Sequence, residues 1–489
     1  LLLFSSIVIN YFIGKGVWNT RSQIKKKGFV TLSVLFNILT LGYFKYAYFF
    51  TESFNKMFHT KHEVFNVFAQ MGNSIFGEGS FVDYIVLPVG VSFFTFQSIS
   101  YVVDIYRKEV KPVKNFFDYA FFVSFFPQLV AGPIVRARDF IPQIRQPFQL
   151  NKTDFSWSII QIVKGFIKKI VLADYIAIHF IDKVVDAPEA FPGFISILAM
   201  WGYSLQIYGD FSGYTDIAIG VSRLMGFKLL ENFNSPYKAI SVADFWRRWH
   251  KSLGSWLRDY LYIPLGGNRS GGIGTYIATM VILIFMIFIT QWYWLLFIYL
   301  GLLITYIGIS LIFPGFKKHV HRDLNLLITM VIGGLWHGAS ENFVIWGAMN
   351  GAALIFYNHW RKISPYENSS GLITRFWRIL ITFNFITFTR IWFRLEDDGA
   401  PINMLNQIWY HFDLNAESFN TLMIGFDTAL YIMVFGYVLH WLPSKFKDFG
   451  ERKFTRMPMV FQSIVVAIML IIIYQAFSDT FKPFVYFQF

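Results

Sequence analysis

Residues 276–288 of the chain are Tyr-Ile-Ala-Thr-Met-Val-Ile-Leu-Ile-Phe-Met-Ile-Phe, and the apolar character continues to Leu300. Comparable uncharged runs cover Ile379–Thr389 and Ser463–Ile473. A segment that crosses the bilayer as a helix needs roughly 20 mostly apolar residues. One such run is compatible with a buried core helix, whereas a long succession of them predicts a polytopic membrane protein.

The composition favours the same all-helical membrane fold. Of the 489 residues, 55% are hydrophobic, 20% are aromatic and 15% are charged, whereas soluble domains carry about 25% charged residues. We predict about 11–13 membrane segments, some of them short or re-entrant. The later spans are expected near residues 84–103, 117–131, 156–180, 194–222, 275–312 (two helices), 324–338, 342–358, 372–392, 424–442 and 460–477.

The basic residues predict the orientation of the chain. They follow the first apolar run at Lys15–Lys27 and recur at Arg107–Lys114, whereas the loop Thr51–Val82 holds few of them. Because Lys and Arg collect in cytoplasmic loops, we expect Thr51–Val82 and the N-terminus outside the cytoplasm. The formal charge of +13 is spread over such loops and does not indicate nucleic-acid binding. We expect one membrane domain over residues 1–489, with a motif core at about 84–360 and peripheral helices at 1–50 and 372–489.

Residues 232–268 interrupt this pattern, since they are neither apolar enough to span nor polar enough to be a plain loop. Aromatic and basic residues alternate in Asp244–His250. On one helix Phe245, Trp249 and Trp256 would share a side, which fits an interfacial amphipathic helix. The alternative is a helix at a polar cytoplasmic mouth, where Arg247 and Arg248 hold a phosphate-bearing donor such as coenzyme A or a phosphopantetheine arm.

Three further polar features stand out, one at the end of this stretch and two within or at the end of apolar segments. A turn with two glycines covers Tyr262–Arg269, where Asp259 and Arg269 are candidates to pair or to bind substrate. Asp210 and Asp216 are expected to hold helices together, with a Ser-His-Asp arrangement as the alternative. Lys45, at the outer end of a helix, is expected to extend toward the membrane surface.

A single histidine stands out in Gly333-Gly334-Leu335-Trp336-His337-Gly338. Ionisable residues at membrane depth usually mark functional sites, and His exchanges a proton near neutral pH, as a general base must. The flanking glycines permit a close backbone approach or a helix break. The alternative is a neutral His337 that is hydrogen-bonded between helices.

Other chemistry has weak support in the sequence. Cysteine is absent, which excludes disulfides, Cys-ligated zinc and thiol nucleophiles. The pairs His59/His62 and His319/His321 have spacings compatible with metal ligands, but we interpret them as surface histidines in loops, and no metal site is expected.

Several of these stretches, taken together, resemble the membrane-bound O-acyltransferase family (MBOAT). They are Asp210–Tyr214, Glu231–Asn234 with Pro236-Tyr237, Phe245–His250, Tyr262–Arg269, Gly334–Gly338 and Trp346-Gly347. Additional stretches resemble the branch of that family concerned with alginate O-acetylation, namely Pro88–Phe93, Gln128–Ile134 and Pro483–Phe489. The resemblance extends from about Gly42 to the end of the chain.

The resemblance implies a ring of helices around a thin centre, with a tunnel between a cytoplasmic and an extracytoplasmic mouth. The essential histidine of the family maps onto His337. A second polar position, His in this branch and often Asn in others, maps onto His250. The residues expected to bind donor or substrate are Arg247, Arg248, Trp246, Trp336, Asp210 and Asn268.

The resemblance further implies transfer of an acyl group, expected to be acetyl, from a cytoplasmic thioester to an extracytoplasmic polysaccharide. The donor would be acetyl-CoA or an acyl carrier protein, with no resident cofactor, and a periplasmic acetyltransferase would be the partner. The location would be the inner (plasma) membrane. Alternatives within the family are D-alanyl transfer to teichoic acid and O-acetylation of peptidoglycan. A transporter or flippase is the alternative of another class, although the chain lacks the internal repeat typical of transporters.

Overall fold

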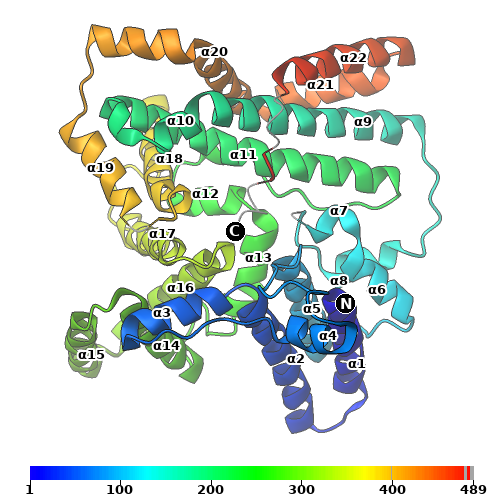
Figure 1. The fold of residues 1–489 in the computed structure, drawn as a ribbon, viewed down its shortest axis with the longest axis vertical. Coiled ribbons are helices and arrows are strands. Elements are labelled where there is room, and N and C mark those ends of the chain that lie inside the picture. Colours follow the sequence, from blue (N-terminus) through cyan, green and yellow to red (C-terminus); the bar gives the residue numbers. More distant parts are fainter. Residues whose placement is uncertain (131, 398, 478–481, 485–489) are drawn as a thin grey trace. The chain divides into compact units, whose positions relative to one another are not determined.

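The computed structural model describes residues 1–130, 132–397, 399–477 and 482–484, and every regular element in these ranges is a helix (Figure 1). The prediction of an all-helical fold is therefore confirmed. Two parts of the quoted motifs, Ala131 and residues 485–489, lie outside the described residues. The chain forms two compact units, the first from residues 1–125, 136–138 and 256–355 and the second from the remainder. The expected single domain with a motif core stays a prediction.

The first unit is built from long helices at both ends of its sequence. Its helices are α1 (Leu2–Asn19), α2 (Gln23–Phe44), α3 (Ala47–Phe58), α4 (Val67–Phe76), α5 (Val91–Tyr106), α6 (Phe116–Ser124), η6 (Arg258–Tyr262), α14 (Ile273–Thr290), α15 (Trp294–Ile312), α16 (Pro314–His337) and most of α17 (Glu341–Trp360).

The second unit contains the long central helix α11 (Gly193–Leu224) and the C-terminal helices. Before α11 come α7 (Phe126–Leu129), α8 (Ala137–Phe140, at the unit boundary), η1 (Ile141–Gln143), α9 (Lys152–Phe166), η2 (Ile167–Tyr175), η3 (Ala177–Ile181), α10 (Asp182–Val185) and η4 (Pro188–Ala190). After it come η5 (Pro236–Lys238), α12 (Val242–Arg248), α13 (Lys251–Leu257, at the boundary), α18 (Leu372–Arg394), α19 (Ala400–Tyr410), α20 (Ala416–Trp441), α21 (Ser444–Arg456) and α22 (Met459–Ala476).

Buried polar side chains connect the first two helices of the first unit. Ser33 on α2 donates to the Oδ1 atom of Asn10 on α1 at 2.7 Å, and Asn37 donates to the same atom at 3.1 Å. Lipid tails are as apolar as the helix surfaces, so there is no hydrophobic driving force for apolar helices to associate in a membrane. Interhelical hydrogen bonds such as these therefore fix which membrane helices pair.

Helices α9 and α11 pack closely against each other in the second unit. A Cβ atom at Gly213 would lie 2.7 Å from the Gly165 carbonyl oxygen, and one at Gly165 would lie 2.6 Å from the Gly213 carbonyl oxygen. The two backbones therefore meet at facing glycines, which is the small-residue packing typical of membrane helices.

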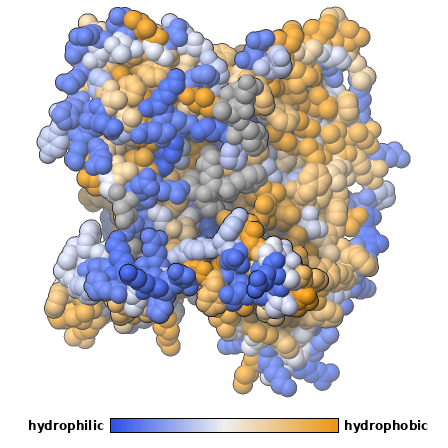
Figure 2. Space-filling view, in the orientation of Figure 1, coloured by the Kyte–Doolittle hydropathy of each residue, from blue (hydrophilic) through white to orange (hydrophobic). Residues whose placement is uncertain are grey.

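Four helices among the described residues are long and apolar enough to cross a membrane, namely α2, α15, α20 and α22. The apolar windows of α15 and α22 are 0% and 6% buried, and Figure 2 shows hydrophobic side chains over both helices. Exposed apolar surface of this extent is stable against lipid and not against water. The larger number of spans expected from the sequence stays a prediction.

Most predicted spans correspond to helices, with differences at polar turns. The span expected to begin at residue 324 is the end of α16, which begins at Pro314 because Pro is favoured in the first helical turn. The segment near 156–180 is continuous but becomes a π-helix at η2. The expected interruption at 232–268 is confirmed, since only the short helices η5, α12, α13 and η6 occur there.

The glycine contact predicts that Gly213→Leu destabilises the protein by about 1–3 kcal/mol, since the added side chain must push α9 away. The measurement is thermal unfolding in detergent. Gly425→Leu, on α20, is the matched control because a Cβ there meets no atom within 4 Å. Equal unfolding temperatures for the two variants would contradict this packing.

Candidate active site

His337 is the last residue of α16 and is only 4% exposed. Gly338 then adopts an extended conformation, and α17 begins at Glu341. A Cβ atom at Gly338 would overlap the ring of Phe343. The glycine therefore allows the chain to end one helix and pack tightly against the next, so the predicted helix break beside His337 is confirmed.

Aromatic rings surround the His337 imidazole. Trp346 lies edge-on to it at 5.2 Å between ring centroids, and Trp336 lies edge-on at 5.0 Å. Trp336 in turn stacks on Phe96 of α5 at 5.5 Å, and Phe96 stacks on Trp256 at 3.6 Å. Such packing excludes water and fixes the orientation of the imidazole ring.

Two side chains from the turn between α2 and α3 satisfy the carbonyl groups at this helix end. The Lys45 ammonium donates to the carbonyl oxygens of Trp336 at 2.7 Å and His337 at 3.0 Å. The Tyr46 hydroxyl donates to the Leu335 carbonyl oxygen at 2.7 Å. A cation is favoured at a helix C-terminus, where carbonyl groups lack helical partners. Lys45 therefore caps the helix that carries His337, and the expectation that it extends toward the membrane surface is wrong.

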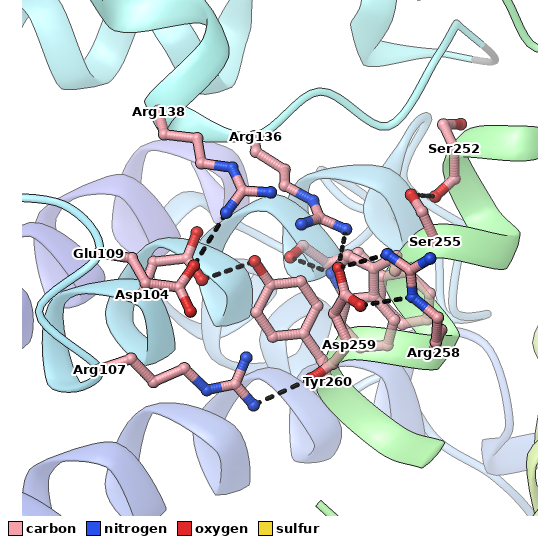
Figure 3. Close-up of polar contacts among 12 residues, drawn as sticks. Asp104, Arg107, Glu109, Arg136, Arg138, Ser252, Ser255, Arg258, Asp259 and Tyr260 are labelled. Carbon is pink, nitrogen blue, oxygen red and sulfur yellow. Dashed lines mark hydrogen bonds and ion pairs between the residues drawn. The ribbon is translucent and has the colours of Figure 1, made fainter. Parts of the chain in front are cut away.

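A network of ion pairs is centred on Asp259 of η6 (Figure 3). Arg136 lies 2.5 Å from this carboxylate and Arg258 lies 2.7 Å from it, while Arg107 donates to its backbone carbonyl at 2.9 Å. Burial acts to raise the pKa of Asp259, but the hydrogen bonds from Arg258 and Arg136 outweigh it and hold the pKa below its usual value. Asp259 thus pairs with Arg136 and Arg258. Its pairing with Arg269, one of the two alternatives that the sequence left open, is not what the structure shows.

Tyr260 connects the network to α5. Its hydroxyl donates to Asp104 at 2.6 Å, and the guanidinium groups of Arg107 and Arg136 lie over its ring at 5.3 and 5.4 Å. Each cation–π contact adds a stabilising term that is larger in partly dry surroundings. The outermost pair, Arg138 with Glu109 at 2.9 Å, is more exposed.

His250 lies between α12 and α13 in the second unit. Its φ of +43° is in the left-handed region, and the residue is 1% exposed. The backbone bends here, so no single helix carries Phe245, Trp249 and Trp256 on one side, and that expectation is wrong. The imidazole lies edge-on to Phe211 of α11 at 4.6 Å.

Arg390, on α18, supports the same region and was not singled out in the sequence. Its guanidinium donates to the Tyr237 hydroxyl at 2.7 Å and lies over the Trp249 ring at 4.7 Å. Arg390 is buried, and Tyr237 in turn donates to the Ser204 carbonyl oxygen on α11. A signal was present in the sequence, because an arginine directly after the apolar run 379–389 is costly unless it has partners.

The other predicted binding residues have partners within the chain. Arg247 is 70% exposed and lies 3.4 Å from Asp244, whereas Arg248 approaches the same carboxylate at 3.0 Å. Trp246 lies edge-on to Phe245 at 5.3 Å. In the first unit the exposed Asn268 accepts a hydrogen bond from Tyr262 at 2.7 Å.

Asp210 and Asp216 on α11 both form ion pairs with lysines. Asp210 lies 2.5 Å from Lys169, and Asp216 lies 2.6 Å from Lys168 and accepts from Gln161 at 2.8 Å. The predicted role in holding helices together is confirmed, since these bonds join α11 to α9 and η2.

The histidine pairs behave differently from each other. His59, His62 and His319 are exposed as expected, although His319 lies on the helix α16 and not in a loop, so that part of the expectation is wrong. His321 is buried on α16, where it accepts from the Gly271 amide at 2.9 Å and lies 2.6 Å from the Tyr276 hydroxyl. Its expected place in a surface loop is therefore wrong.

Comparison with known proteins identifies the family. Residues 108–307 match the model of the membrane-bound O-acyltransferase family. A probable alginate O-acetylase, AlgI, from Pseudomonas aeruginosa is 33% identical over 94% of this chain and 74% of its own length. The chain belongs to the membrane-bound O-acyltransferase family. It is therefore a membrane-embedded acyltransferase, and this identification favours an enzyme over the transporter alternative.

Other relatives extend over much of the chain. A peptidoglycan O-acetyltransferase from Helicobacter pylori is 32% identical over 83% of this chain and 69% of its own length. A teichoic acid D-alanyltransferase from Bacillus subtilis is 28% identical over 61% of this chain and 67% of its own length.

The helix cap predicts the effect of Lys45→Met in this acyltransferase. Two carbonyl oxygens lose their donor, so the variant should be less stable by about 1–3 kcal/mol. Thermal unfolding in detergent measures this, and Lys27→Met, at an exposed position of α2, is the control. A Lys45→Met protein as stable as the control would mean that the cap contributes nothing.

The ion-pair network predicts unequal effects for two arginines. Arg136→Met should lower the free energy of unfolding by roughly 2–3 kcal/mol. This loss is smaller than for an isolated buried ion pair because Arg258 still contacts Asp259. Arg138→Met should lower the free energy of unfolding by less than about 1 kcal/mol, because its ion pair with Glu109 is exposed. Unfolding by denaturant compares the two, and similar losses would contradict the buried character of the first pair.

Proposed function

We propose that this protein moves an acetyl group from a cytoplasmic thioester to a hydroxyl group of an extracytoplasmic polysaccharide. The acceptor class follows from the relatives, whose names specify alginate and peptidoglycan at 33% and 32% identity. The D-alanyltransferase is less similar, at 28%, which favours acetyl transfer over D-alanyl transfer. The donor would be acetyl-CoA or an acylated carrier protein.

The observation that carries the proposal is the environment of His337. A buried imidazole held by aromatic rings, at a capped helix end, has the fixed orientation that proton transfer requires. His337 takes the proton of the acceptor hydroxyl while the hydroxyl oxygen attacks the thioester carbonyl. The C–S bond then breaks, and the departing thiolate receives the proton from the His337 imidazolium. In the covalent variant the imidazole attacks the thioester carbonyl and displaces the thiolate, and the acceptor hydroxyl then takes the acyl group and releases the imidazole.

The second unit supplies the remaining proposed roles. His250 orients the donor, and Trp246 packs against it. The exposed Arg247, with Arg248, holds the phosphates of the donor. The protein is proposed to lie in the inner (plasma) membrane with its N-terminus outside the cytoplasm, and to pass the acyl group on through a periplasmic acetyltransferase.

The test compares wild type with His337→Ala in lipid vesicles supplied with radiolabelled acetyl-CoA, or with a labelled acyl carrier protein, together with the partner acetyltransferase and an added polysaccharide acceptor. We expect transfer to fall by at least about 100-fold, the contribution of a positioned general base. Unfolding temperatures of the two proteins check that the variant is folded.

His319→Ala is the matched control because His319 is an exposed histidine on the same helix α16. Its activity should equal that of wild type. Transfer at the wild-type rate by His337→Ala would overturn the proposed role of this residue.

A further inference from the structure

Helix α21 joins α20 to α22 (Figure 1), and both of these neighbours are long and apolar enough to cross a membrane. The proposed chemistry assigns no role to α21. Trp441, the last residue of α20, is 50% exposed, and tryptophan collects at the level of the lipid headgroups. Because α21 leaves one such helix and enters another, both of its ends lie at a boundary of the membrane.

The charge of this helix indicates the side of the membrane on which it lies. Residues 395–444, which include all of α20, contain no Lys or Arg, whereas residues 445–456 contain five basic and two acidic side chains. Lys and Arg collect on the cytoplasmic side of membrane proteins. We therefore expect α21 at the cytoplasmic leaflet.

One side of α21 is fixed to the rest of the second unit. Lys447, Glu451 and Phe454 follow one another at intervals of four and three residues and therefore share this side of the helix. The Lys447 ammonium donates to the His440 carbonyl oxygen at the end of α20 at 3.1 Å. Glu451 contacts Lys164 of α9 at 2.7 Å, and Phe454 is buried. These contacts fix the rotation of α21 about its axis, so its other sides face outward.

Exposed aromatic rings lie on the outward side of α21. Phe446 and Phe449 are 62% and 54% exposed. Lys453 follows them on the same side, and its ammonium lies 5.4 Å from the centre of the Phe449 ring. Two neighbouring phenyl rings are unfavourable in water. They are favourable where an amphipathic helix reaches the boundary between headgroups and acyl chains.

A basic stripe runs beside these rings. Lys445, Arg452 and Arg456 are separated by seven and four residues and therefore share one side of the helix. All three are exposed, as is Lys453. Among the described residues the one ion pair of α21 is that of Glu451. The four outward cations therefore lack an anionic partner from this part of the chain.

We propose that α21 lies along the cytoplasmic leaflet as an interfacial helix, with Phe446 and Phe449 at the hydrocarbon boundary, and that its basic stripe binds the headgroups of anionic phospholipids. Lipid phosphates accept charge-assisted hydrogen bonds from Lys and Arg, and so supply the anions that the chain does not provide. The contacts on the inner side of α21 then connect the bound lipids to α9 and α20. The inference does not depend on the proposed acyl transfer.

The first test measures the depth of the helix. Because the chain has no cysteine, one nitroxide label can be attached at Phe446→Cys, and power-saturation EPR then gives its depth in nanodiscs of phosphatidylcholine and phosphatidylglycerol. We expect this label about 5–10 Å below the headgroup phosphates. The matched control is Asp448→Cys, since residues two apart point to nearly opposite sides of an α-helix, and its label should lie in water. Equal depths for the two labels, or a label at residue 446 in water, would overturn the inference.

The second test identifies the lipids around the helix. A fluorophore on the same cysteine is quenched by brominated phosphatidylglycerol or by brominated phosphatidylcholine, each at equal mole fraction in the mixed nanodisc. We expect phosphatidylglycerol to be enriched at least about fivefold at the label, the factor that one basic side chain contributes at an anionic leaflet. The enrichment should disappear in the quadruple variant Lys445→Gln/Arg452→Gln/Lys453→Gln/Arg456→Gln.

The matched control removes the same number of exposed basic side chains from the first unit, as Arg21→Gln/Lys25→Gln/Lys27→Gln/Lys114→Gln, and should leave the enrichment unchanged. Equal quenching by the two lipids, or enrichment that persists in the quadruple variant of α21, would overturn the lipid binding. Fluorescence that responds to added acyl carrier protein and to neither lipid would overturn it as well, because this side of α21 would then bind an acidic protein.

Discussion

In lipid a backbone carbonyl group that loses its helical partner finds no water, so each helix end inside the membrane protein must be satisfied by the protein itself. The end of α16 shows how this constraint shapes the site. Lys45 and Tyr46 bond to the last carbonyl groups of the helix, and the ring of Phe343 occupies the space next to Gly338. The same contacts that make the helix end stable also hold the imidazole of His337 in one orientation.

In both units the buried charged side chains form ion pairs. In the first unit Asp259 contacts two guanidinium groups, and in the second Lys169 contacts two carboxylates. Removing one member of such a pair leaves a desolvated charge, which costs more than the pair gains. These residues therefore join segments that are distant in sequence, such as the segment before α8 with η6 and η2 with α11, where apolar packing alone has little specificity.

The sequence was sufficient for the fold class, for most helix positions and for the break beside His337, because apolar run length and glycine placement are local properties. The partners of the charged residues lie far away along the chain, so residue spacing could not predict them. Pairing with Arg269, ten positions away, was one of two alternatives for Asp259, yet Arg136 provides the pair from another segment. His321 was expected in a surface loop, whereas it is buried and contacts Tyr276 and Gly271. The cap by Lys45 and the contacts of Arg390 likewise depend on tertiary neighbours that spacing does not specify.

The left-handed backbone at His250 also limits which residues that position can hold. Outside glycine, such a φ is tolerated mainly by Asn, Asp and His, and for other side chains it costs about 1–3 kcal/mol. Substitutions at this position are therefore limited first by the backbone conformation and only then by the chemistry of the side chain. The interchange of His and Asn expected at this position among members of the family is one that the turn itself permits, whereas a β-branched or bulky replacement would have to remodel the junction of α12 and α13 before it could be tested for function.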